Sequence, residues 1–278
     1  MTEHYKAAFV GDLQIPYHNK RAVELFMKAM KAWKPHYIDF VGDIDDQLEY
    51  STFSDGTTDE FFNRLKKEKQ GEDEDDAAFM RRTDPLPFIR DNALGAREFY
   101  TAVRKQHPKA DLHASLGNHD IRIFKYMDKK APNFVDEITP NMLWGLDDLG
   151  ITWRLYHEPP MERFAGIYVH HGATTTTTGL AVRSDIELYN ISLVRGHDHR
   201  GGVVYKSYPL TGGSLVGMGT GHMCDPSAYG LQYTINPSWE QGFGIAHIVD
   251  GKAHLQFIPI RSTDEGLTCV LDGRVFVA

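Results

Sequence analysis

The stretches KAAFVGD (6–12) and HYIDFVGD (36–43) both run from apolar residues into Gly-Asp. Each is typical of a short buried β-strand that ends in a turn. A helix is predicted over residues 19–33, with Asn19 as its N-cap and Pro35 just beyond its end. Its apolar positions follow helical spacing: Ala22, Leu25, Phe26, Ala29 and Met30. Strand, helix and strand in this order imply a parallel pair whose carboxyl ends share one edge of a sheet.

The rest of the chain extends this pattern into a mixed α/β fold. A helix is expected over 87–106, with Phe88, Ile89, Leu94, Phe99 and Val103 on its buried side. DLHASLGNHD (111–120) is expected to be a third strand, and 181–190 a helix between later strands. The other expected strands are 150–158, 164–172, 191–199, 201–208 and 268–277, with a hairpin over 244–260 that turns at Asp250-Gly251. The sequence therefore predicts βαβ units followed by a strand-rich half.

Composition bounds the class of protein. The 278 residues are 41% hydrophobic and 24% charged, which are ordinary globular values. The sequence has no apolar run of about 18 residues and no secretory leader pattern. It has only two cysteines, so a cytoplasmic location is expected. The net charge of −8 disfavours a broad surface for nucleic acid. We expect one domain over 1–278, in which a polar insertion at about 47–86 forms a lid.

Five polar clusters each follow a predicted strand. Ligands bind at the carboxyl edge of the strands in α/β sheets, so these clusters are expected to converge there. Their mixture of carboxylate oxygen and imidazole nitrogen suits Mn, Fe, Zn or Ni better than Ca or Mg. The clusters are Asp12-Leu13-Gln14, Gly42-Asp43-Ile44-Asp45-Asp46, Gly117-Asn118-His119-Asp120, His170-His171-Gly172 and Gly196-His197-Asp198-His199.

The order of these motifs resembles the calcineurin-like metallophosphoesterase superfamily. That pattern is Asp-x-His, Gly-Asp-x-x-Asp, Gly-Asn-His-Asp/Glu, His-Gly and Gly-His-x-His, and the match spans residues 11–199. The overall layout is similar to uncharacterised phosphoesterases of bacteriophage genomes. The resemblance implies a four-layer α/β/β/α sandwich with a dinuclear metal site at the strand carboxyl ends.

The resemblance also implies the ligands. One divalent ion would be held by Asp12, Gln14, Asp43 and His199. The second would be held by Asp43, Asn118, His171 and His197, so that Asp43 bridges. His171 is preferred to His170 because the family ligand directly precedes the glycine, and only one of two neighbouring strand residues can face the ions.

The remaining motif residues are expected to act on the phosphate or to support the site. By the resemblance, His119 lies over the scissile phosphate, oriented by Asp120, while Asp46 supports the ligands from behind. Arg122 is either a phosphate contact or a helix-surface arginine.

Gln14 is the departure from the family pattern, which most often has His there. An amide oxygen is a weaker ligand for a transition metal than imidazole, so Mn²⁺ is favoured over Fe, Zn or Ni.

Two bound dications would hold a bridging water, lower its pKa and present it as hydroxide to the phosphorus. The predicted function is therefore metal-dependent hydrolysis of a phosphodiester or nucleotide-like substrate. A DNA or RNA nuclease and a catalytically weakened scaffold are the alternatives; the monoester or diester preference and the oligomeric state stay open. Seven aromatic residues near predicted loops could stack on a base: Tyr17, Tyr50, Phe53, Trp144, Tyr229, Tyr233 and Trp239.

The Gly-rich segment 211–242 is expected to form a wall of the site. His222 and Cys224 within it are a candidate stray metal pair.

Overall fold

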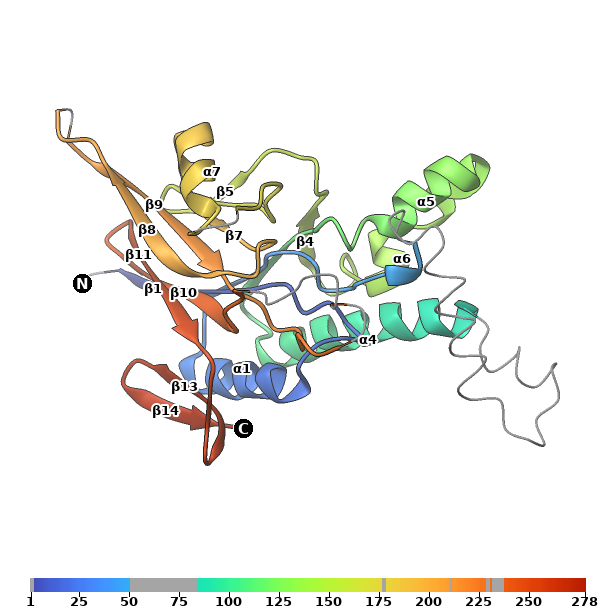
Figure 1. The fold of residues 1–278 in the computed structure, drawn as a ribbon, viewed down its shortest axis with the longest axis horizontal. Coiled ribbons are helices and arrows are strands. Elements are labelled where there is room, and N and C mark those ends of the chain that lie inside the picture. Colours follow the sequence, from blue (N-terminus) through green and yellow to red (C-terminus); the bar gives the residue numbers. More distant parts are fainter. Residues whose placement is uncertain (1–2, 51–84, 177–178, 211, 229–230, 232–237) are drawn as a thin grey trace.

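The computed structural model describes residues 3–50, 85–176, 179–210, 212–228, 231 and 238–278. The predicted lid and Phe53, Tyr229 and Tyr233 thus lie wholly or mostly outside the described residues. The described chain forms mixed α/β structure with two large sheets and a three-stranded one (Figure 1). No helix in these residues has the length and apolar character needed to cross a membrane.

The six-stranded sheet contains the predicted βαβ unit. Strands β1 to β4 are parallel, β10 pairs antiparallel with β1, and β11 pairs antiparallel with β10. The predicted hairpin is confirmed, and Asp250 and Gly251 adopt φ of 48° and 71° at its turn. The order across the sheet is β11 (Lys252–Pro259), β10 (Gly242–Val249), β1 (His4–Val10), β2 (Tyr37–Phe40), β3 (Asp111–Ser115) and β4 (Ile151–Arg154).

The five-stranded sheet has a parallel centre formed by β6, β7 and β9, with an antiparallel strand at each edge. Its order is β5 (Met161–Phe164), β6 (Ile167–Val169), β7 (Ser192–Arg195), β9 (Ser214–Thr220) and β8 (Gly201–Ser207). The three-stranded sheet consists of β12 (Arg261–Thr263), β13 (Gly266–Leu271) and β14 (Arg274–Val277).

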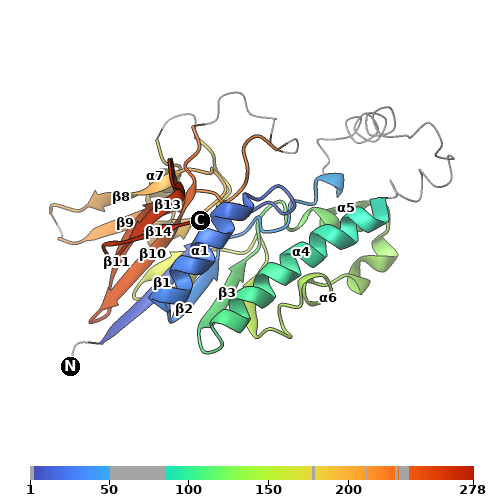
Figure 2. The ribbon, with the colours of Figure 1, turned by 90° about the horizontal axis from the view of Figure 1, so that it is seen from below.

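Helices cover the outer faces of both large sheets. The helical elements are α1 (Lys20–Trp33), η1 (Leu48–Tyr50), α4 (Pro85–Gln106), α5 (Arg122–Lys130), η3 (Pro132–Glu137), α6 (Pro140–Trp144) and α7 (Val182–Tyr189). Figure 2 shows α1 and α4 across one face of the six-stranded sheet, and α7 lies on the far side of the five-stranded sheet. The Asn19 side chain accepts a hydrogen bond from the Ala22 amide, so the predicted N-cap of α1 is confirmed.

Three apolar clusters hold these layers together. The largest packs α1 and α4 on the six-stranded sheet, with Phe26, Phe40 and Tyr100 among its members. The second lies between the two sheets and includes Phe9 and Met218. The third places α7 on the five-stranded sheet. The layer order is therefore helix, sheet, sheet, helix.

Three local expectations need correction. Leu94 is 42% exposed because it lies on the opposite face of α4 from Val103, nine residues further along the helix. The segment 268–277 is not one strand, since β13 and β14 turn back on each other at Asp272 and Gly273. Part of the expected loop wall at 211–242 is the strand β9.

Candidate metal centre

The predicted ligands follow the carboxyl ends of parallel strands from both large sheets. In the six-stranded sheet, Asp12 and Gln14 follow β1, Asp43 follows β2 and Asn118 follows β3. In the five-stranded sheet, His171 follows β6, while His197 and His199 follow β7. Parallel strands share one edge for these ends, so residues distant in sequence meet at one place.

Asp12, Gln14 and His199 form the first group, here called the Asp12 cluster. The Nε2 atom of His199 lies 3.2 Å from Oδ1 of Asp12 and 3.2 Å from Nε2 of Gln14. The Gln14 Oε1 and His199 Nδ1 atoms are buried and have no hydrogen-bond partner among the described residues. Because amide oxygen and nitrogen are assigned from the surrounding contacts, a rotated Gln14 amide would bring its oxygen to the same point.

Asp43, Asn118, His171 and His197 form the second group, the Asp43 cluster. The Nε2 atom of His171 lies 3.1 Å from Oδ2 of Asp43 and 3.2 Å from Oδ1 of Asn118. The Nδ1 atom of His171 donates to the Val41 carbonyl at 2.6 Å, which leaves Nε2 to face the cluster. His197 has a ring nitrogen within 4.8 Å of ligand atoms of Asp43 and His171.

The chemistry of these donors fits divalent cations. Atoms bound to one ion at about 2.1 Å lie about 3.0–3.4 Å apart, which matches the spacing in both clusters. Asp12 and Asp43 are at most 1% exposed. In the described part of the chain neither carboxylate forms an ion pair with Lys or Arg. Buried carboxylates need a compensating charge, which a cation would supply.

The pKa values of the side chains in the Asp43 cluster also indicate that this cluster favours a positive charge. Burial opposes the charge of Asp43, yet His119 and His171 hold its pKa well below the usual range. Burial likewise opposes a charge on His171, but the Asp43 carboxylate raises its pKa to about 9. Burial and the charge of His171 lower the pKa of His197 to about 3. A positive charge is thus favoured among the ligands even without metal.

Local backbone geometry shows why these motifs contain strained residues and glycine. Asp12, Gln14, Asp43, His197 and His199 all have φ between 51° and 75°, a region that side chains other than glycine rarely adopt. Such strain concentrates at functional sites.

The motif glycines allow close approach. A Cβ atom on Gly117 would lie 2.0 Å from Asp43 Oδ1, and one on Gly196 would lie 2.4 Å from Asp12 Oδ2. The Gly residues of these motifs therefore make room for the carboxylates.

His119 lies beside the Asp43 cluster within a polar triad. Its Nε2 atom is 3.8 Å from Asp43 Oδ2, and its Nδ1 atom is 2.9 Å from Asp46 Oδ1. Arg122 donates to the same Asp46 oxygen at 2.6 Å and places Nη2 3.0 Å from His119 Nε2. Arg122 is therefore part of the site and not a helix-surface arginine.

Asp120 has a different role from the expected one. Its carboxylate accepts backbone N–H bonds from Asp43, Ile44, Asp45 and Gly117 at 2.7–3.0 Å. It therefore fastens the loop after β2 to the loop after β3. Asp46, not Asp120, contacts the His119 ring. The pairing is between residues 73 positions apart, so the local motif could not reveal it.

The neighbouring residues His170 and His171 have different surroundings. His170 faces away from the ligands: its Nδ1 accepts from the Gly172 amide, and its Nε2 lies 3.3 Å from the Tyr156 carbonyl. His171 is the one that meets Asp43 and Asn118.

The candidate pair in the Gly-rich segment lacks a third ligand. Cys224 Sγ and His222 Nδ1 are 3.1 Å apart. No other Asp, Glu, His or Cys in the described ranges completes a three-ligand cluster there.

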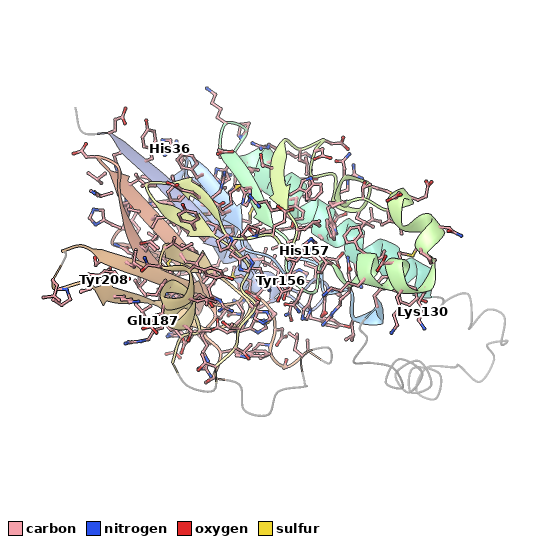
Figure 3. The ribbon with its side chains drawn as sticks, turned by 90° about the horizontal axis from the view of Figure 1, so that it is seen from above. His36, Lys130, Tyr156, His157, Glu187 and Tyr208 are labelled. Carbon is pink, nitrogen blue, oxygen red and sulfur yellow. The ribbon has the colours of Figure 1, made fainter. Side chains whose placement is uncertain are left out.

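Two aromatic rings pack on predicted ligand histidines, one in each cluster. The partly exposed Trp239 lies edge-on against His199, with ring centres 4.2 Å apart. Tyr156, which lies outside the five polar motifs, has its ring centre 5.9 Å from that of His171, and Figure 3 labels it. Its signal was its position just after β4.

Two other aromatic candidates have different surroundings. Trp144 is 1% exposed and donates to Asp45, so it belongs to the core. Tyr50 packs on Tyr126.

No protein-family model matches the chain. The Gene 54 protein of Mycobacterium phage D29 is 22% identical over 258 residues, covering 90% of this chain and 92% of that protein. The Gene 54 protein of Mycobacterium phage L5 is 21% identical over 274 residues, covering 96% of each.

Solved structures with a similar fold include Vacuolar Protein Sorting 29 from Cryptosporidium parvum, at 14% identity, covering 99% of this chain and 96% of that one, with a TM-score of 0.43. They also include YfcE, a phosphoesterase from E. coli, at 10% identity, covering 98% and 97%, with a TM-score of 0.39.

Proposed function

We propose that this protein is a dinuclear metallophosphoesterase of the calcineurin-like type, which hydrolyses a phosphodiester or nucleotide-like ester. The observation that carries the proposal is the convergence of two oxygen- and nitrogen-rich ligand clusters beside His119. Asp12, Gln14 and His199 would hold one ion; Asn118, His171 and His197 would hold the other, with Asp43 between them. Divalent ions bound there would supply a water of lowered pKa and neutralise charge on the phosphoryl oxygens.

The chain's own residues would act on the leaving group. His119 stands next to Asp43, where it can donate a proton to the departing oxygen. Asp46 fixes the ring through Nδ1, so Nε2 is the nitrogen that faces the site. The Arg122 guanidinium, which can only donate, lies 3.0 Å from that nitrogen. Turned to a phosphate oxygen of the substrate, it would offer a donor there and leave Nε2 free to carry the proton.

The flanking aromatic rings favour a diester. Trp239 packs on a histidine of the Asp12 cluster and Tyr156 on one of the Asp43 cluster. A substrate with a group on each side of its phosphate could place one against each ring.

A metal reconstitution assay tests the proposal. Protein stripped of metal is given Mn²⁺, Zn²⁺, Ni²⁺ or Mg²⁺, and hydrolysis of bis-p-nitrophenyl phosphate and p-nitrophenyl phosphate is measured. We expect Mn²⁺-dependent turnover that favours the diester and falls about 100-fold or more in His119→Ala. His254→Ala, an exposed histidine on β11, is the matched control and keeps full activity. Folded protein with two bound ions and no turnover on either ester would refute the proposal.

A further inference from the structure

The helix α5, which begins beside His119, carries a basic and aromatic face of which the proposed chemistry uses only Arg122. The helix α5 contains one acidic residue, Asp128, and four basic residues: Arg122, Lys125, Lys129 and Lys130. Arg122, Lys125, Tyr126 and Lys129 are three or four residues apart, so they lie together on one face. The buried Ile123 marks the inward side. A chain with net charge −8 thus concentrates positive charge on the helix that leads away from its candidate metal centre.

These cations are free to meet a ligand. Lys125, Lys129 and Lys130 are exposed, and none forms an ion pair with a carboxylate of the described residues. Arg122 differs from them because Asp46 holds it at the His119 end of the face. From Arg122 to Lys129 the helix rises about 10 Å. The face therefore extends well beyond the space needed for one phosphate.

Aromatic rings are interleaved with the charges. Tyr126 is 41% exposed between Arg122 and Lys129. Lys125 Nζ lies 5.7 Å from the centre of the Tyr156 ring, and that ring contacts His171 of the Asp43 cluster. Tyr156 thus connects the helix face to the candidate metal ligands. Figure 3 shows Tyr156 near the middle of the molecule and Lys130 towards the outer end of α5.

We infer that the substrate is a single-stranded nucleic acid whose backbone follows α5 into the metal centre. Cations along a track bind successive phosphates, and exposed rings stack on unpaired bases of any sequence. Bases of a duplex are already stacked on each other, which favours a single strand. This inference rests on the proposed function and names the class of diester that the site hydrolyses. The net charge of the chain is negative, but a nucleic acid would contact the basic face of α5, so the local charge decides.

A binding experiment without metal tests the inference apart from catalysis. Fluorescein-labelled oligothymidylates, a dinucleotide and a twelve-nucleotide strand, are titrated in EDTA and followed by anisotropy. We expect the longer strand to bind at least about 10-fold more tightly, because it reaches more of the cations. Lys125→Gln/Lys129→Gln should weaken its binding about 10-fold and reduce the slope of log Kd against log salt by about 1.4. Tyr126→Leu should weaken it about 10-fold through lost stacking.

The control removes the same charge elsewhere. Lys31→Gln/Lys252→Gln changes exposed lysines of α1 and β11 and should leave binding unchanged. Equal affinity in both double variants, or equal affinity for short and long strands, overturns the inference. Tighter binding of a duplex than of the single strand also overturns it. If wild-type protein hydrolyses bis-p-nitrophenyl phosphate but fails these binding tests, the inference alone fails. If it binds the strand but never shows metal-dependent hydrolysis, the proposed function fails.

Discussion

Gln14 is the residue on which the Asp12 cluster depends most. Apart from the shared Asp43, the proposed ligand set gives this ion only Asp12 and His199 besides Gln14, whose amide lies 3.2 Å from His199. Gln14→Leu keeps a similar volume but removes the amide, so bound Mn²⁺ should fall from about two ions per chain to about one. Elemental analysis after equilibrium dialysis measures this. Gln256→Leu, at an exposed position of β11, should retain two ions. If the Gln14→Leu variant still binds two ions per chain, Gln14 is not a metal ligand.

Asp46 is predicted to act through His119, as a positioning residue. Its Oδ1 atom accepts from both His119 and Arg122, so Asp46→Asn leaves the ring less firmly held. We expect kcat on bis-p-nitrophenyl phosphate to fall about 10–100-fold, with a smaller change in KM and unchanged metal content. Asp264→Asn, an exposed position between β12 and β13, should have full kcat. An unchanged kcat in Asp46→Asn would show that the triad does not hold His119 for the reaction.

At the scale of elements, Asp120 joins the loops that follow β2 and β3. Asparagine in its place offers one oxygen for four backbone N–H groups, and its own amide hydrogens face some of them. Asp120→Asn should therefore lower the free energy of unfolding by about 1–3 kcal/mol. Calorimetry should record a Tm lower by roughly 2–10 °C. A wild-type Tm in this variant would mean that the four bonds do not stabilise the junction.

The sequence predicted elements with local signals and missed those shaped by distant contacts. The helix α1 has its apolar stripe within its own fourteen residues and its cap, Asn19, directly before them, and both are present as expected. The strand β9 was missed because two of its residues are Gly217 and Gly219, which read as loop. A Cβ on Gly217 would lie 2.8 Å from Val182, and one on Gly219 would lie 2.3 Å from the Arg200 carbonyl. Glycine is needed at these two positions because neighbouring elements approach the strand closely. This packing depends on residues distant in sequence, so no local pattern predicts it. The same reason explains why Asp46, and not the expected Asp120, contacts His119: Asp46 and His119 are 73 positions apart and meet only in the folded chain.

At the scale of the whole molecule, the candidate centre joins the two sheets. The Asp12 and Asp43 clusters each combine ligands that follow strands of the six-stranded sheet with histidines that follow β6 and β7 of the other sheet. Among the described residues, the two sheets are also joined by apolar packing that includes Phe9 and Met218 and by the ion pair between Arg163 and Asp39. Metal binding should therefore stabilise the entire described fold and not one loop.

This coupling predicts a large thermal response to metal. A ligand that binds only the folded state at 100 times its Kd adds about 2.7 kcal/mol of stability per site. For a chain of this size we expect Mn²⁺ to raise the Tm by roughly 5–10 °C or more over protein in EDTA, in a single transition. Scanning calorimetry measures both features. Asp43→Asn removes a charge shared by the proposed ions and should lose most of the shift, whereas Asp264→Asn should keep it. A shift of the same size in Asp43→Asn would mean that Mn²⁺ stabilises the protein from another site.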